Sequence, residues 1–257
     1  MSTILFGSVV FGPVHSRRLG VSLGVNLLPI DSKFCNFNCI YCECGWNPKG
    51  GKPRLPLRAE VQSQLVARLD AMHSKGERLD VITFAGNGEP TIHPDFEGII
   101  DDTLAARDAH YPEARVVVLS NASMLDRASV SRALHRIDQV ALKLDAPYDD
   151  LLQLINGPQM RLTVADVVAR LRAFGHAYTL QTLFLRGEYR GQVVDNATPQ
   201  AIEDWLAIVA DLRPRDVMVY TIDRETPAQG LEKVSLDELR AIAARVEALG
   251  IGVQVSG

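Results

Sequence analysis

Short apolar runs rich in β-branched residues alternate along this chain with segments in which apolar residues recur at helical spacing. We expect seven of these runs to form strands: 21–28, 81–85, 116–119, 140–144, 179–185, 217–220 and 251–255. Several are almost continuously apolar, which is typical of parallel strands covered on both faces. Repeated strand–helix units favour parallel strands joined by right-handed crossovers. The sequence therefore predicts an α/β fold built on a parallel sheet.

The helical segments between these runs have readable ends. Thr198 precedes Pro199, which places an N-cap before a proline in the first helical turn. Ser235 with Glu238 fits a capping box, and Thr163 precedes a further helix over 164–174. These signals support the alternation of strands and helices.

We count about six strand–helix units, which is too few for a closed eight-stranded barrel. The chain has no internal repeat, linker or low-complexity stretch. We therefore expect a single domain over 1–257, folded as an open or partial (β/α)6 barrel with its core at 21–221. Residues 1–20 are expected to form an N-terminal extension, and 222–257 a loop, a helix and a short strand. The loops at the carboxyl ends of the strands should hold the active site.

Composition excludes several classes of protein. Hydrophobic residues make up 47% of the chain and charged residues 23%, which is too apolar for intrinsic disorder. No apolar stretch reaches the roughly 20 residues that span a bilayer, and the N-terminus lacks the pattern of a signal peptide. We expect a cytoplasmic protein without a membrane partner. The net charge of −4 disfavours a general nucleic-acid coat but allows a local basic patch.

All four cysteines lie within one ten-residue window: Cys35, Cys39, Cys42 and Cys44. Disulfides that stabilise a fold would be scattered, so this clustering indicates metal binding or redox chemistry. The first three have the spacing C-x3-C-x2-C, on a loop over 34–45 that follows the first expected strand. A structural zinc site usually combines two cysteine pairs separated by a longer stretch. Three thiolates on one short loop are suited instead to an iron–sulfur cube whose fourth iron lacks a protein ligand.

A glycine turn ends the second expected strand: Gly86, Asn87, Gly88 and Glu89, followed by proline. The glycines would let the backbone approach a ligand closely. The turn lacks the Lys-Ser/Thr of a P-loop and the third glycine of a dinucleotide-binding fingerprint. Taken alone, such a turn is common and carries little information.

Polar residues also follow the other strands. The candidates are Ser120, Asn121, Lys143, Asp145, Gln181 and Tyr220. Lys143 and Asp145 share one face of their strand by period-two alternation. If that face points inward, a buried pair of opposite charges indicates a functional role. For any one of these residues, ordinary polarity of an exposed loop is an equally good explanation.

Two charged segments stand near the ends of the expected barrel. One contains Arg17 and Arg18, and the other contains Arg224. Charged clusters usually form solvated loops, but these arginines are also candidates for binding an anionic substrate.

The C-x3-C-x2-C spacing, with Tyr41 before the last cysteine, resembles the signature of the radical S-adenosylmethionine (radical SAM) superfamily. The turn 86–89 resembles the second motif of that family. The resemblance implies a partial (β/α)6 barrel in which Cys35, Cys39 and Cys42 bind a catalytic 4Fe–4S cluster, while SAM chelates the fourth iron. It further implies that Tyr41 contacts the adenine of SAM and that residues 86–89 hold its methionyl ammonium group.

In that family, positions equivalent to the polar strand ends hold the ribose hydroxyls and carboxylate of SAM. The resemblance thus implies SAM contacts for Ser120, Asn121, Lys143 and Asp145, with Gln181 and Tyr220 as further candidates.

The sequence around these motifs is similar to that of a small branch of the superfamily, which is related to wybutosine-forming tRNA-modifying enzymes and to glycyl-radical activases. The implied activity is cleavage of SAM to a 5′-deoxyadenosyl radical that takes a hydrogen atom from a small molecule, a peptide or an RNA. The family usually draws its electron from a flavodoxin or ferredoxin. Cys44 could donate a hydrogen atom or be an ordinary thiol. The alternative is a zinc- or iron–sulfur-binding structural or redox protein that does not cleave SAM.

Overall fold

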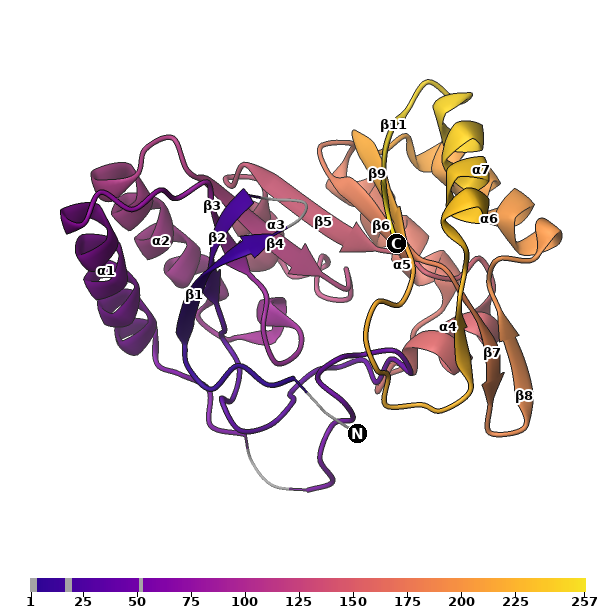
Figure 1. Ribbon diagram of the computed structural model, residues 1–257, viewed down its shortest axis with the longest axis horizontal. Coiled ribbons are helices and arrows are strands. Elements are labelled where there is room, and N and C mark those ends of the chain that lie inside the picture. The colour runs from indigo at the N-terminus through magenta and orange to yellow at the C-terminus, as the bar shows by residue number, and fades with distance from the viewer. Residues whose placement is uncertain (1–3, 17–19, 51–52) are drawn as a thin grey trace.

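The computed structural model describes residues 4–16, 20–50 and 53–257. Its main feature is a curved, eight-stranded sheet with the strand order β1-β2-β3-β4-β5-β6-β9-β11 (Figure 1). The strands are β1 (Val10–Ser16), β2 (Gly20–Val25), β3 (Val81–Phe84), β4 (Arg115–Ser120), β5 (Gln139–Lys143), β6 (Thr179–Leu183), β9 (Asp216–Tyr220) and β11 (Gly252–Ser256). β1 pairs with β2 in antiparallel fashion, and every later pair of neighbours is parallel.

The six parallel strands from β2 to β9 confirm the predicted partial barrel. Among the described residues β11 does not pair with β1, so the sheet stays open. The expected core at 21–221 stops short of β11, which the structure places beside β9 as a seventh parallel strand. The stretch 222–257 thus contributes one strand, β11, to the main sheet.

Seven helices of the described chain connect or flank the strands. They are α1 (Arg58–Ser74), α2 (Phe96–His110), α3 (Ala128–Leu134), α4 (Asp149–Asn156), α5 (Val164–Phe174), α6 (Pro199–Leu212) and α7 (Leu236–Glu247). A short 3-10 turn, η1, spans Pro90–Ile92. Figure 1 shows α1 and α2 near the end of the sheet that contains β1, and α6 and α7 near the end that contains β11.

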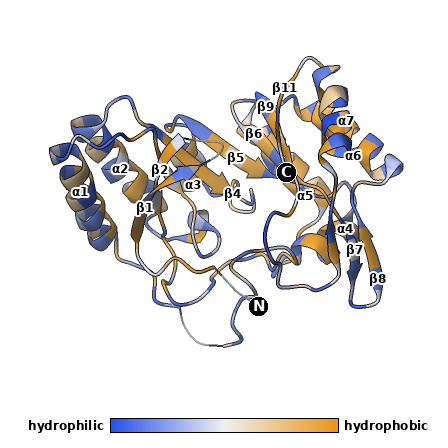
Figure 2. Cartoon of the chain, in the orientation of Figure 1, coloured by the Kyte–Doolittle hydropathy of each residue, from blue (hydrophilic) through white to orange (hydrophobic). Residues whose placement is uncertain are grey.

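The apolar pattern explains how helices and sheet pack. Every residue of β3 is buried, because helices cover one face and the barrel interior the other. On α1 the buried residues Val61, Leu65 and Leu69 recur every fourth position and so form one apolar stripe. Figure 2 shows this division, with hydrophobic colour along the strands and hydrophilic colour on the outer faces of the helices.

The predicted helix starts are confirmed. The Thr198 side chain accepts a hydrogen bond from the backbone N–H of Ala201. Capping boxes begin both α5 and α7, at Thr163 and Ser235. Each cap satisfies N–H groups that the first helical turn leaves without a partner.

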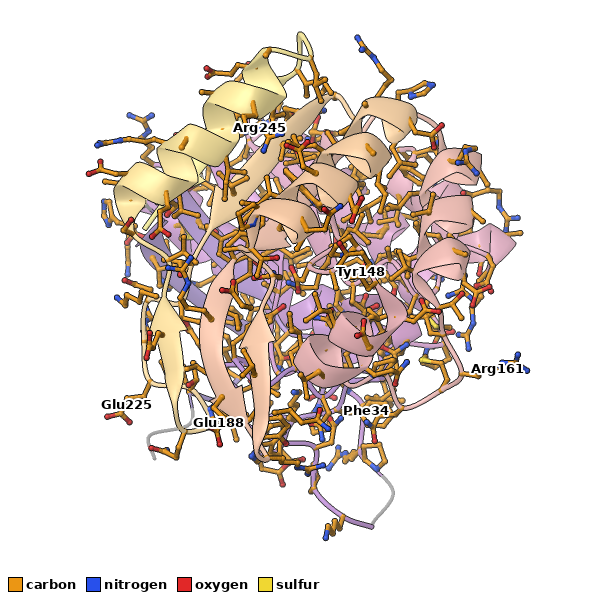
Figure 3. The ribbon with its side chains drawn as sticks, turned by 90° about the vertical axis from the view of Figure 1, so that its right-hand side faces the viewer. Phe34, Tyr148, Arg161, Glu188, Glu225 and Arg245 are labelled. Carbon is orange, nitrogen blue, oxygen red and sulfur yellow. The ribbon has the colours of Figure 1, made fainter. Side chains whose placement is uncertain are left out.

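A second, small antiparallel sheet is absent from the sequence-based prediction. Its strands are β7 (Leu185–Tyr189), β8 (Gln192–Asp195) and β10 (Leu231–Lys233), in the order β10-β7-β8. Figure 3 shows this sheet, with Glu188 labelled, beside α4 and below α6 and α7. The single run expected at 179–185 is divided at Phe184 between β6 and β7.

Buried Asn196 holds this division in place. Its side-chain amide donates to the carbonyl oxygens of Asp145 and Leu183, both at 2.7 Å, and its side-chain oxygen accepts from the N–H of Leu185 at 2.8 Å. These three bonds satisfy backbone groups that the bend between the two strands would otherwise leave buried without partners.

In the described part of the chain no helix is both long enough and apolar enough to span a membrane.

The capping box of α7 predicts a pH dependence of stability. Hydrogen bonds from the side chain and backbone N–H of Ser235, then the Arg186 guanidinium, lower the pKa of Glu238 from 4.5 to about 2. Because the unfolded carboxyl takes up its proton near 4.5, this contribution is complete above that pH and is lost as the pH falls toward 2. We expect Glu238→Gln to destabilise the protein at neutral pH, and the deficit to shrink between pH 4.5 and 2. Urea unfolding of both proteins across this range measures it, and a constant deficit would contradict the assignment.

Candidate active site

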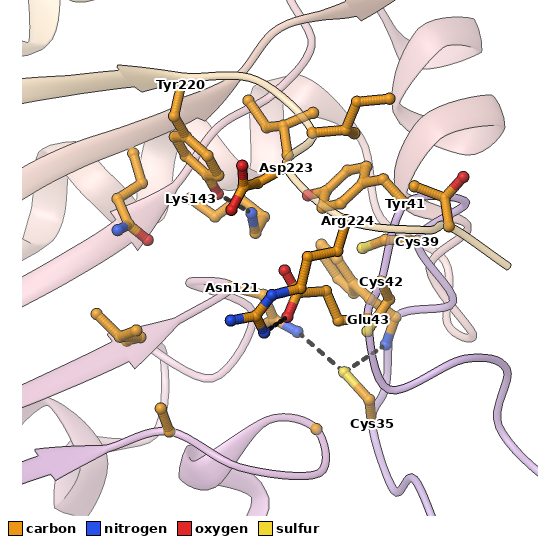
Figure 4. A pocket seen from close by; sticks show the side chains of 18 of the residues that line it. Cys35, Cys39, Tyr41, Cys42, Glu43, Asn121, Lys143, Tyr220, Asp223 and Arg224 are labelled. Carbon is orange, nitrogen blue, oxygen red and sulfur yellow. Dashed lines mark hydrogen bonds and ion pairs between the residues drawn. The ribbon is translucent and has the colours of Figure 1, made fainter. Parts of the chain in front are cut away.

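A cavity of about 460 Å³ lies at the carboxyl ends of the parallel strands (Figure 4). Most of the predicted site residues line it: Cys35, Cys39, Tyr41, Cys42, Gly86, Gly88, Glu89, Ser120, Asn121, Lys143, Gln181, Tyr220 and Arg224. Asn87 and Asp145 are buried behind this wall. Arg17 and Arg18 lie outside the described residues. The fold therefore gathers residues from nearly 190 positions of sequence around one space, at the end of the barrel where catalytic loops are expected.

The loop that carries the cysteines, residues 34–45 (the cluster loop), is held by Asn47. The side-chain oxygen of Asn47 accepts from the N–H of Cys35 at 3.0 Å. Its amide group donates to the carbonyl oxygens of Cys35 at 2.9 Å and Phe37 at 3.1 Å. A segment without regular secondary structure needs such partners for its backbone groups. One asparagine thus fixes the path of the chain around the first cysteine.

The cluster loop also packs directly against the glycine turn after β3. The N–H of Phe34 donates to the carbonyl oxygen of Asn87 at 2.8 Å, and Phe34 forms a parallel bridge with Gly88. A Cβ atom at Gly88 would clash with the Phe34 carbonyl, and its φ of 143° is unfavourable for other residues. A Cβ at Gly86 would likewise clash with the Asn26 side chain. The glycines therefore permit close approach of protein to protein, in addition to lining the cavity.

Side-chain and backbone amides point at two of the cysteine sulfurs. The side-chain amide of Asn121 donates to Cys35 Sγ at 3.8 Å, as does the N–H of Phe37 at 3.3 Å. The side-chain amide of Asn156 donates to Cys39 Sγ at 3.5 Å. All described cysteines are free thiols. Donors aimed at sulfur favour the thiolate, which is the form that binds metal.

The cysteines differ in their electrostatic surroundings. Burial raises the pKa of Cys35 and Cys39. The pKa of Cys42 is lowered, because the Cys44 thiol donates a hydrogen bond to its sulfur and outweighs burial, with Lys33 assisting. Cys44 also donates to the carbonyl oxygen of Gly86 at 3.5 Å and is not among the residues that line the cavity. The structure thus places Cys44 as a support for Cys42.

Lys33 was not identified from the sequence, although its side chain is only 3% exposed and lines the cavity. Its ammonium group donates to the carbonyl oxygen of Gly45 at 2.9 Å. Burial alone would lower the pKa of Lys33, but its electrostatic interactions with Cys42, Cys39 and Cys35 and a hydrogen bond with Cys42 together raise it. Among the described residues no carboxylate forms an ion pair with Lys33. The available signal was a lysine two positions before the first cysteine.

Glu89 is at the centre of a buried hydrogen-bond network. Its Oε1 accepts from the N–H of Thr91 at 3.1 Å, from the Thr91 hydroxyl at 2.5 Å and from the Ser120 hydroxyl at 2.9 Å. Its Oε2 accepts from the N–H of Asn121 at 2.7 Å. Burial nevertheless raises the pKa of Glu89. This network joins β3 to β4, and Oε2 retains a second acceptor position for a ligand.

Asn87 has a positioning role in this structure. Its side-chain amide donates to the carbonyl oxygens of Pro29 and Phe6, and its side-chain oxygen accepts from the N–H of Phe6. These bonds attach the N-terminal segment to the turn after β3.

The structure contains the pair of Lys143 and Asp145, at the end of β5, that was predicted from the alternation of side chains along this strand. Lys143 Nζ lies 3.4 Å from Asp145 Oδ2, and the Asp145 side chain is completely buried. Lys143 also donates to the Tyr220 hydroxyl at 3.1 Å and lies over the ring of Tyr41, 5.1 Å from its centroid. Burial would lower the pKa of Lys143, but Asp145 and Tyr220 raise it. This lysine is therefore a cation held at the cavity wall by a carboxylate.

The carboxylate of Asp145 also accepts hydrogen bonds from several other groups of the protein. It accepts hydrogen bonds from the N–H of Leu183 at 2.9 Å, from the Asn156 side chain at 2.7 Å and from the Tyr41 hydroxyl. Since Asn156 also donates to Cys39 Sγ, this network links β5, α4 and the cluster loop.

Two further predicted residues lie on the cavity wall. The Gln181 side chain donates to the sulfur of Met218 at 3.3 Å. Arg224 forms an ion pair with Glu43 at 2.7 Å, which joins the cluster loop to the segment after β9 (Figure 4). The side chains of this pair are 56% and 44% exposed, so solvent screening limits its contribution to stability.

Comparison with known proteins agrees with this geometry. The family model of the radical SAM superfamily matches residues 30–198. A UPF0026 protein of Helicobacter pylori strain J99 is 30% identical over 252 residues, which cover 95% of this chain and 76% of that protein. The chain belongs to the radical SAM superfamily and to its UPF0026 group. It is thus a radical SAM enzyme.

Other similarities cover larger proteins. A protein named GTPase Obg from Brachyspira hyodysenteriae is 29% identical over 243 residues, which cover 93% of this chain. The chain spans 33% of that protein's length. The sequence of the present chain contains no P-loop motif of the form Gly-x4-Gly-Lys-Ser/Thr.

Solved radical SAM structures share the fold. A radical SAM methyltransferase from Sphaerobacter thermophilus has a TM-score of 0.68 at 19% identity, over 91% of this chain and 65% of that one. Archaeal TYW1 has a TM-score of 0.56 at 13% identity, over 88% of this chain and 71% of that one.

The contact between the cluster loop and the glycine turn can be tested by stability. We expect Gly88→Ala to destabilise the protein by about 1–3 kcal/mol, because the new Cβ is strained at this φ and clashes with the Phe34 carbonyl. Hydrogen exchange at the Phe34 amide should accelerate. Gly252→Ala is the matched control, since no atom lies within 4 Å of its Cβ position. Equal stability of the two variants would show that the contact does not hold the loop.

Proposed function

We propose that Cys35, Cys39 and Cys42 hold a 4Fe–4S cluster and that SAM binds in the adjoining cavity. The chemistry supplied when both are bound is reductive cleavage of SAM to methionine and a 5′-deoxyadenosyl radical, which takes a hydrogen atom from the substrate. The observation that carries the proposal is the placement of three free thiols on one cavity wall, next to the buried ammonium group of Lys33, which has no carboxylate partner among the described residues.

The arrangement fits a cluster better than a single zinc ion. A mononuclear site needs its ligands gathered around one ion, with each Zn–S distance about 2.3 Å. In the part of the chain that the structure describes, no three His, Cys, Asp or Glu side chains are gathered closely enough to share an ion. A cluster instead assigns each cysteine to a different iron and so accepts sulfurs that are farther apart.

The remaining wall has groups that complement SAM. The cavity volume of about 460 Å³ lies within the usual range for small-molecule sites. The free acceptor position on Glu89, with the carbonyl groups of residues 86–88, suits the methionyl ammonium group. Lys143 is a donor for a carboxylate or ribose hydroxyl, and Tyr41 presents its ring for the adenine. We assign Ser120, Asn121, Asp145, Gln181 and Tyr220 to the support of these contacts.

The protein's own contribution is to orient and to exclude water. Tyr41 cannot rotate freely, because its hydroxyl bonds Asp145. The side chains of Leu119, Leu183 and Ile222 line the same cavity and reduce its access to water. The partly exposed ion pair of Glu43 and Arg224 lies on the wall of the same cavity, where its charged groups would meet a polar substrate. We infer a small molecule, a peptide or an RNA as substrate, and a flavodoxin or ferredoxin as electron donor.

Cysteine variants test this proposal. Anaerobically reconstituted protein should hold about four iron and four sulfide per chain and release 5′-deoxyadenosine with SAM and dithionite. Cys39→Ala should lose both the cluster and the activity, because a ligand is missing. Cys44→Ala is the matched control and should keep its cluster, since Cys44 does not line the cavity. Zinc without iron or sulfide in the wild type, or a full cluster in Cys39→Ala, would overturn the proposal.

A further inference from the structure

Lys33 is a buried cation whose position the proposed chemistry does not yet explain. It is the only buried lysine in the described part of the chain, with 3% of its surface exposed. Its ammonium group has one neutral partner in the protein, the Gly45 carbonyl oxygen at 2.9 Å. An ammonium group removed from water is strongly unfavourable unless a negative charge compensates it.

The groups that act electrostatically on the Lys33 ammonium are the sulfurs of the cysteines. Its electrostatic partners are Cys42, Cys39 and Cys35, and it also hydrogen bonds with Cys42. Lys143, the other lysine on this cavity, is compensated by Asp145 at 3.4 Å. Lys143 also interacts with Cys39, but Asp145 is its main counter-charge, whereas the counter-charges of Lys33 are the sulfurs.

The side chain also forms part of a dividing wall. Lys33 and Cys35 line the active-site cavity and also a neighbouring cavity of about 450 Å³. The stem of Lys33 therefore fills space between the two cavities while its charged end is held beside the cysteines. A substitution that tests the charge must keep this length.

We propose that Lys33 is a positioning residue whose fixed positive charge compensates the cysteine-bound cluster and raises its reduction potential. The inference rests on the proposed function. Three thiolates on a cluster core of charge +2 leave a net charge of −1, and uptake of one electron from the donor makes it −2. A buried cation stabilises the reduced form more than the oxidised form, because attraction grows with the cluster's negative charge. The proton of Lys33 stays in place throughout this reduction.

The test is a redox titration of reconstituted protein without SAM, followed by the electron paramagnetic resonance signal of the reduced cluster. Lys33→Met and Lys33→Gln should both shift the midpoint potential to more negative values and by similar amounts. Gln keeps a donor for the Gly45 carbonyl but lacks the charge, so it separates charge from hydrogen bonding. Lys33→Arg should restore a potential near that of the wild type. The shift should persist at high salt, because a buried charge is poorly screened.

Lys49→Met is the matched control. It removes the same charge from an exposed lysine only a few residues beyond the cluster loop, where water and salt screen it, so the potential should stay at the wild-type value. A wild-type midpoint potential in Lys33→Met would overturn the inference. So would a shift of the midpoint potential in Lys33→Met that is absent in Lys33→Gln. Cluster loss in Met and Gln with retention in Arg would support a requirement for charge, whereas loss in all three would show only a packing requirement and overturn it. A wild type without a cluster would instead defeat the proposed function, and that is measured first.

Discussion

The site depends on one backbone contact, the close packing of the cluster loop against the turn after β3. Phe34 and Gly88 meet there as a parallel bridge, and the Phe34 N–H bonds the Asn87 carbonyl. The cluster loop has little regular secondary structure, so its position must come from such contacts and from the side chain of Asn47. Because β3 is a fully buried strand with a parallel neighbour on each side, the contact attaches an irregular loop to the core of the sheet.

The polar residues around the cavity extend this attachment from strand to strand. Glu89 joins the turn after β3 to the end of β4, and Asp145 joins the end of β5 to Tyr41 and Asn156. The same networks supply the amides that point at sulfur, from Asn121 to Cys35 and from Asn156 to Cys39. Buried networks of this kind hold their members firmly when every group has a partner. The residues that build the cavity wall therefore also orient the cysteines.

The parts of this structure that follow from short-range patterns could be predicted from the sequence. Apolar runs located the parallel strands, and hydrogen-bonding side chains marked the starts of α5, α6 and α7. The small antiparallel sheet could not be predicted, because β8 and β10 are largely exposed and the bend before β7 depends on Asn196, which is distant from its partner Asp145 in sequence. The glycines of the turn were recognised, but a pattern cannot say that Phe34 is what approaches Gly88.

Lys33 illustrates the same limit for charge. A lysine beside a cysteine motif is usually read as solvated. Only the fold shows that the ammonium group of Lys33 is buried beside the sulfurs and that it forms no ion pair with a carboxylate in the described chain. Lys143 was recognisable because Asp145 stands two positions away on the same strand face. The two lysines therefore differ in the origin of their compensation: one has its counter-charge encoded locally, and the other obtains it from the site itself. A site arranged in this way is electrostatically complete only when the cysteines carry negative charge, which ties the burial of Lys33 to the thiolate chemistry of the cluster loop.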